Sequence, residues 1–144
     1  MEKIKRDKNR VDLPSIKENS IEGGYIIKID KASGDSSCES CYNSSMSFRS
    51  NYNSNGSISE NSQVYFIYHY PKPDEITEDQ KNYIQSVIDS FETVLVSDDN
   101  YGDFNEIIDI DSFVDFFIIN ELTKNIDGFR LSTFLNKDYD GVMI

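Results

Sequence analysis

The stretch that decides the fold reads Asn120-Glu121-Leu122-Thr123-Lys124-Asn125-Ile126-Asp127-Gly128-Phe129-Arg130-Leu131-Ser132-Thr133-Phe134-Leu135. An almost wholly apolar segment, residues 113–119, precedes this stretch, and an apolar run typical of a strand closes it. Asp127 is therefore expected between two buried elements, where a carboxylate is costly unless it is hydrogen-bonded, paired or used in chemistry. Two interpretations follow: a turn aspartate favoured by Gly128, or a catalytic side chain.

The elements around this turn follow from apolar spacing and capping residues. A helix is expected to begin at Asp109 or Asp111, since aspartate caps free backbone amides at a helix start. Apolar side chains cover most of its circumference, so we expect it to be the central buried helix. After the turn, residues 130–135, a turn at 136–141 and residues 142–144 together predict a β-hairpin.

Strand and helix signals also occur upstream. Residues 25–29 and 64–70 are rich in β-branched and aromatic residues and are bounded by Gly or Pro, which predicts two strands. Thr77 and Gln80 form a capping-box pair that begins another helix. Its apolar face is expected to hold Tyr83, Ile84, Val87, Ile88, Phe91, Val94 and Leu95. The predicted fold class is α+β, with two main helices packed on antiparallel strands.

Residues 33–62 are rich in Ser and Asn and contain few apolar side chains. Such a segment cannot offset its ordering entropy, so we expect a long mobile insertion. It contains Cys38 and Cys41, whose spacing suits a zinc half-site or a redox pair. Because there is no second cysteine pair and His69 is the only histidine, an incidental pair in a loop is the favoured interpretation.

Composition excludes some functions. The 144 residues fit one domain, and a net charge of −12 disfavours a nucleic-acid partner. A basic peptide or a metal-bound polyphosphate suits such a surface better. No apolar run is long enough to span a membrane, and the charged start lacks the apolar core of a secretory signal.

Three further sets of residues are candidate sites. The acidic run from Asp98 to Asp109 lacks the glycine and the glutamate of a calcium loop, so a solvated linker with helix-capping acids is favoured. His69 reads as a strand residue rather than a base. The basic residues from Lys3 to Arg10 have no glycine-rich loop beside them, so a solvated face is favoured over phosphate binding.

Longer strings add a family resemblance. In order, they are residues 2–11 (EKIKRDKNRV), 24–26 (GYI), 70–71 (YP) with 77–81 (TEDQK), 110–115 (IDSFVD), 120–122 (NEL) and 125–128 (NIDG). Together they resemble the CotH kinase family of spore-coat atypical protein kinases over nearly the whole chain, apart from the insertion at 33–62.

The resemblance implies an atypical protein-kinase fold that uses ATP with Mg²⁺ or another divalent metal. It also implies transfer of the γ-phosphoryl group to Ser or Thr of a protein substrate, and an extracytoplasmic or cell-surface location. Asp127 matches the catalytic-loop aspartate, which orients the acceptor hydroxyl, accepts its proton and needs a rigid seat. Asn125 is expected to brace that loop by hydrogen bonds.

The chain departs from the kinase pattern at several points. Ser132 occupies the place of the metal-binding asparagine of ordinary protein kinases, so no metal role is assigned to it. The Trp-Asp-Phe-type motif of the family is absent, and no lysine matches the phosphate-contacting one. Because the chain stops inside a predicted strand, we expect residues 1–144 to be a partial domain, truncated at both ends and inactive alone.

Two other functions remain open. One is a non-catalytic surface or coat binding module of the same fold, because fold does not fix activity. The other is an exported substrate-like protein whose serine-rich insertion is itself modified. Apolar surfaces left exposed in a partial domain predict poor solubility or self-association.

Overall fold

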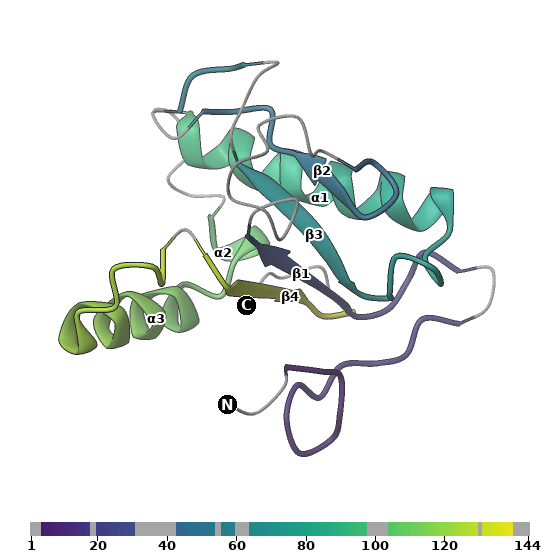
Figure 1. The fold of residues 1–144 in the computed structure, drawn as a ribbon, viewed down its shortest axis with the longest axis horizontal. Helices are drawn as coiled ribbons and strands as arrows, with labels where there is room; N and C mark the ends of the chain where they lie inside the picture. The colour runs from purple at the N-terminus through teal and green to yellow at the C-terminus, as the bar shows by residue number, and fades with distance from the viewer. Residues whose placement is uncertain are drawn as a thin grey trace.

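The structure is a computed structural model that describes residues 4–17, 20–30, 43–53, 56–59, 64–97, 104–129 and 131–139. Four antiparallel strands form one sheet in the order β2-β3-β1-β4 (Figure 1). The strands are β1 Tyr25–Ile29, β2 Ser47–Arg49, β3 Tyr65–Tyr70 and β4 Thr133–Lys137, and the helices are α1 Glu78–Val96, α2 Phe104–Ile107 and α3 Ile110–Thr123. The α+β class is confirmed. Within the described ranges, no helix is both long and apolar enough to cross a membrane.

Strand β1 lies at the centre of the sheet and pairs with two partners. Ile27 stands opposite Tyr68 of β3 on one side and opposite Leu135 of β4 on the other. The two upstream strands are thus confirmed. Strand β4 pairs with β1, and the predicted hairpin stays a prediction, because its second strand, residues 142–144, lies outside the described part of the chain.

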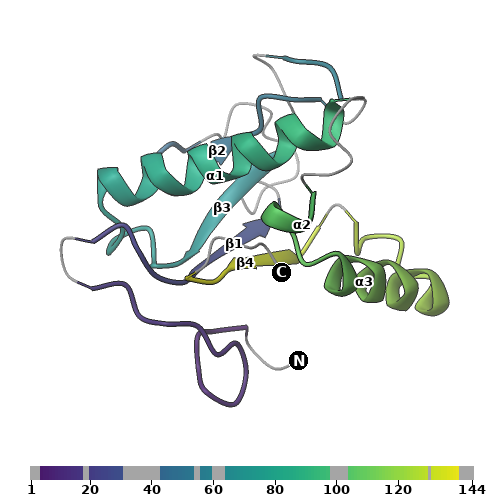
Figure 2. The same ribbon diagram turned by 180° about the vertical axis from the view of Figure 1, so that it is seen from behind.

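Helix α1 covers one face of the sheet (Figure 2). It begins with the predicted capping box, in which Thr77 Oγ1 accepts from Gln80 N while Gln80 Oε1 accepts from Thr77 N. Its buried residues are Gln80, Ile84, Ile88 and Phe91, which recur every three or four positions and therefore lie on one face of the helix. The core between helix and sheet consists of Tyr25, Ile27, Phe48, Phe66, Tyr68, Ile76, Ile84, Ile88, Phe91, Ile108 and Leu135.

The N-terminal segment contacts the C-terminal end of β3. Ile26 is buried although it is not part of the core under α1, and Leu13 of the N-terminal segment is buried as well. His69 Nε2 lies 2.8 Å from Ile4 O, which confirms its interpretation as a satisfied strand residue. Arg6 donates to Leu13 O at 2.7 Å and stacks over Tyr70.

Part of the predicted insertion is a strand. Ser47–Arg49 pairs with β3, and Phe48 stacks on Phe66 with ring centroids 5.3 Å apart. The expectation that residues 33–62 lack structure is therefore wrong for this stretch, because one aromatic anchor and an open strand edge supply the missing contacts. Residues 31–42, which include Cys38 and Cys41, lie outside the described residues.

The segment after β2 binds α1 through side chains. Ser50 Oγ donates to Glu92, Asn51 Nδ2 donates to Asp89 at 2.5 Å, and the hydroxyls of Tyr52 and Thr93 are 3.0 Å apart. Burial raises the pKa of the Glu92 carboxyl above its ordinary value of 4.5, and the nearby Asp89 adds to this, although the Ser50 hydrogen bond opposes it.

This carboxyl predicts a measurable pH dependence. Its raised pKa means that the folded state holds the proton more tightly, so Glu92 favours folding increasingly as pH falls through the raised pKa towards 4.5. Glu92→Gln keeps an acceptor for Ser50 and removes the buried charge. We expect the variant to have the larger free energy of unfolding at pH 8 and a flatter pH profile above 4.5, measured by urea titration. Glu78→Gln at the exposed start of α1 is the control, and an equal change in both variants contradicts the prediction.

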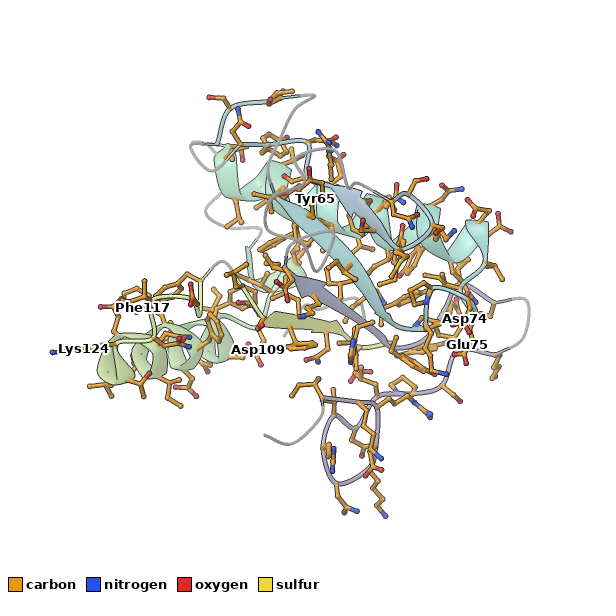
Figure 3. All side chains as sticks on the ribbon, in the orientation of Figure 1. Tyr65, Asp74, Glu75, Asp109, Phe117 and Lys124 are labelled. Carbon is orange, nitrogen blue, oxygen red and sulfur yellow. The ribbon has the colours of Figure 1, made fainter. Side chains whose placement is uncertain are left out.

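Helix α3 leaves the sheet rather than crossing it. Asp109 caps it by accepting from Ser112 N at 3.3 Å, which confirms the predicted start. Figure 3 shows Asp109 near β4 and Lys124 at the far end of the helix. The expectation of a central buried helix is wrong: Phe113 contacts the core, but the rest of the helix carries exposed apolar side chains. Those exposed are Ile110, Val114, Phe116, Phe117, Ile118, Ile119 and Leu122.

Candidate active-site loop

Asp127 lies in the loop that joins α3 to β4. Helix α3 ends at Lys124, whose left-handed backbone (φ 52°, ψ 42°) turns the chain and lets its N–H bond to Asn120 O and Glu121 O. The Asp127 residue is exposed, so the expectation that two buried elements enclose it is wrong. Asp127 is exposed because α3, the helix that was expected to bury it, is itself exposed and is not covered by other described residues.

The loop around Asp127 is nevertheless held by hydrogen bonds. Asn125 Nδ2 donates to Asn120 Oδ1 at 2.9 Å, so the expected bracing role of Asn125 is confirmed. Gly128 N donates to Asn125 O at 3.1 Å, and Leu131 N donates to Asp127 O at 2.8 Å. These bonds fix the backbone on both sides of Asp127, which is itself an exposed residue.

A groove of about 510 Å³ lies next to this loop, between α3 and β4. Phe129, two residues after Asp127, forms part of its wall and contacts the rings of Phe116 and Phe117, each with centroids 5.9 Å away. The wall is mostly aromatic and includes Ile29, Phe91, Phe113, Phe134 and Leu135. Asp127 itself does not line the groove, so the carboxylate stands beside an apolar surface rather than inside it.

Lys137 is the buried cation of the described residues, with 1% of its surface exposed. Its Nζ lies 5.2 Å from the Tyr83 ring centroid and 6.0 Å from that of Tyr25, and it donates to Asp138 O at 2.7 Å. Burial, with a smaller effect of Tyr83, raises the pKa of the Tyr25 phenol. Lys137 does not line the groove, so its contacts point to a structural role at the other end of β4.

The structure does not bring the other sequence candidates to Asp127. His69 lies in β3 against Phe134, Asp109 caps α3, and residues 98–103 of the acidic run lie outside the described part. Ser132 is exposed with a positive φ of 56°. Among the residues that the structure describes, no three His, Cys, Asp or Glu side chains come together as a metal site. These residues therefore do not by themselves fit a divalent metal ion.

Sequence reasoning assigned no role in holding the loop to Asn120 of α3 or Thr133 of β4, and it treated Gly128 only as a turn residue. Thr133 Oγ1 donates to Gly128 O at 2.6 Å, and Asn120 is buried in a helix whose neighbouring residues are exposed. One signal was present, because an asparagine that follows seven largely apolar residues is unusual unless its amide is hydrogen-bonded. The other two contacts depend on how the loop returns to the sheet.

Comparison with known proteins gives one match. The family model described as CotH kinase protein matches residues 1–143, nearly the whole chain. Neither the curated proteins nor the solved structures contain a match to this chain.

Proposed function

The chain belongs to the CotH kinase family, and from this premise we propose that it serves in transfer of a phosphoryl group from ATP to Ser or Thr of a protein substrate. Asp127 is assigned as the base. The observation that supports this assignment is that Asp127 is an exposed residue on a loop whose backbone is fixed by hydrogen bonds on both sides.

The chemical step assigned to this chain is proton transfer at Asp127. The carboxylate accepts a hydrogen bond from the acceptor hydroxyl, orients its oxygen and takes up its proton. The new oxygen–phosphorus bond forms as the bond between the γ-phosphorus and the bridging oxygen of ATP breaks, and ADP leaves with the electron pair. Because phosphoryl transfer depends mainly on positioning, a fixed loop matters more here than a strongly basic group. The requirement for ATP and Mg²⁺ or another divalent metal is proposed on family membership alone.

The experiment compares Asp127→Ala and Asp127→Asn with the parent in the protein encoded by the complete reading frame. Transfer of label from γ-³²P-ATP is measured on the protein itself and on dephosphorylated casein, with Mg²⁺ or Mn²⁺. Loss of a base costs about 100- to 10,000-fold in rate, so both variants are expected to lose nearly all labelling. Asp115→Asn, an exposed carboxylate on α3, is the control and is expected to label like the parent. Equal labelling of Asp127→Ala and the parent contradicts the assignment.

A second function is favoured by a different observation. The exposed apolar residues of α3 and the adjacent groove form a surface of the kind that marks protein interaction sites. A non-catalytic binding module at a coat or cell surface, the location proposed from the family, would use this surface without chemistry at Asp127. Absence of labelling from the parent protein with either metal, under conditions in which a known kinase labels casein, favours this module.

A further inference from the structure

We propose that Asn120 is a positioning residue that, together with Gly128 and Thr133, locks the Asp127 loop between α3 and the sheet. The catalytic consequence of this lock rests on the proposed function, whereas the lock itself is a property of the fold. Each of the three residues makes a contact that helps to fix the position of the loop.

Asn120 ties the end of α3 to the loop through both ends of its amide. The side chain is buried, with 4% of the residue exposed. Its Nδ2 donates to Phe116 O at 2.8 Å, and its Oδ1 accepts from Asn125 Nδ2 at 2.9 Å. Its backbone carbonyl also accepts from Asn125 N at 3.0 Å. A buried amide that is this fully bonded restrains the groups it joins.

Gly128 fits against Asn120 so closely that no side chain can replace its hydrogen. A Cβ at this position would lie 1.9 Å from Asn120 Oδ1 and 2.6 Å from Asn125 Nδ2. Contact between atoms at such distances forces the amides or the loop to move. The glycine is therefore required by close approach, and the requirement comes from Asn120 in particular.

Thr133 holds the other side of the loop to the sheet. Its Oγ1 donates to Gly128 O at 2.6 Å in a buried position, and its backbone pairs with Ile29 at the end of β1. Gly128 is thus held by Asn120 on the helix side and by Thr133 on the sheet side. Asp127 is the residue immediately before Gly128, so these two contacts set where its backbone lies.

The lock has a catalytic consequence if Asp127 is the base. A base must lie within hydrogen-bond reach of the hydroxyl, and a displacement of about 1 Å costs about 100-fold in rate. Loosening the loop is therefore expected to lower kcat, while the KM for ATP, which depends on other groups, changes by less than about twofold.

The first test uses the close approach of the Asn120 side chain to Gly128. Amide hydrogen exchange is measured at Asn125, Gly128 and Leu131, with β1 and β3 amides as the internal reference, in Asn120→Ala, Gly128→Ala and the double variant. Gly128→Ala is expected to speed exchange in the loop about tenfold or more when Asn120 is present. In the Asn120→Ala background the same substitution is expected to add little, because the Asn120 oxygen is gone and the Asn125 amide, no longer bonded to it, can move away from the new Cβ.

The second test uses a matched pair at Thr133. Thr133→Val keeps the shape of the side chain and removes the hydroxyl, and is expected to speed exchange at Gly128 and Leu131 about tenfold. Thr133→Ser keeps the hydroxyl and is expected to retain most of the protection. Equal exchange in the Val and Ser variants, or additive effects of the Asn120 and Gly128 substitutions, overturns the lock.

Kinetics in the protein encoded by the complete reading frame separate the two proposals. A kcat lowered about 100-fold in Asn120→Ala and Thr133→Val, with loop exchange raised and sheet exchange unchanged, supports the positioning role. Faster loop exchange with unchanged kcat, while Asp127→Ala abolishes labelling, overturns that role. If Asp127→Ala labels like the parent, the proposed function fails together with the positioning role, whereas the exchange data still decide whether the lock exists.

Discussion

Ile84→Ala is expected to lower the free energy of unfolding of this domain by about 3–4 kcal/mol. Ile84 has 0% exposed surface and lies on the face of α1 that covers the sheet. Its replacement loses the transfer free energy of three carbons and leaves a cavity between α1 and the sheet. Against a total stability of about 5–15 kcal/mol for a typical domain, this is a large fraction.

The matched control is Leu95→Ala in the same helix. Leu95 is 50% exposed and lies near the C-terminal end of α1, so its truncation is expected to cost less than about 1 kcal/mol. Both variants are compared with the parent by urea denaturation of the 144-residue chain, followed by circular dichroism. Similar losses at the two positions would show that α1 does not cover the sheet as described.

Replacing Leu122 and Ile126 together by Gln is expected to weaken self-association of the chain about 100-fold. The two side chains are 77% and 87% exposed at the far end of α3 and in the loop after it. Burying two such side chains in a contact between copies contributes about 3 kcal/mol, and every 1.4 kcal/mol changes an association constant about tenfold. Gln leaves the net charge unchanged, so the comparison isolates apolar contact.

Sedimentation velocity over a range of protein concentrations measures this effect. Leu95→Gln serves as the control, because it removes a single exposed apolar side chain from a different helix, α1, and is expected to sediment like the parent. A double variant that associates as strongly as the parent would show that α3 does not mediate contact between copies.

Elements with local signals were predicted correctly. Thr77 and Gln80 cap the start of α1, and Asp109 caps the start of α3. Both caps consist of contacts between residues three positions apart, and both are present in the structure. Strand β3 ends just before Pro71, as predicted. Such features depend on neighbouring residues, so the sequence carries the information directly.

Elements that depend on distant contacts were not predicted. Phe48 gives β2 its anchor only because Phe66 and Tyr68 of β3 present their rings to it. The apolar residues of α3 predicted that the helix is buried. An apolar helix sequence is compatible with burial, but it does not specify which other segment packs against the helix. In the site, Asn125 was identified because it lies close to Asp127, whereas Gly128 and Thr133 acquire their roles through a turn whose path no local pattern encodes.

The central position of β1 between β3 and β4 has a consequence for biosynthesis. Tyr25 pairs with Lys137, and Ile29 pairs with Thr133, so the sheet joins an early and a late part of the polypeptide. During translation, β1 emerges from the ribosome long before β4 and presents an unsatisfied edge until β4 has emerged as well. Pairing of such distant segments is slow and exposes nascent chains to aggregation. Because Thr133 also holds Gly128, the Asp127 loop acquires its final geometry in the same late step that closes the sheet.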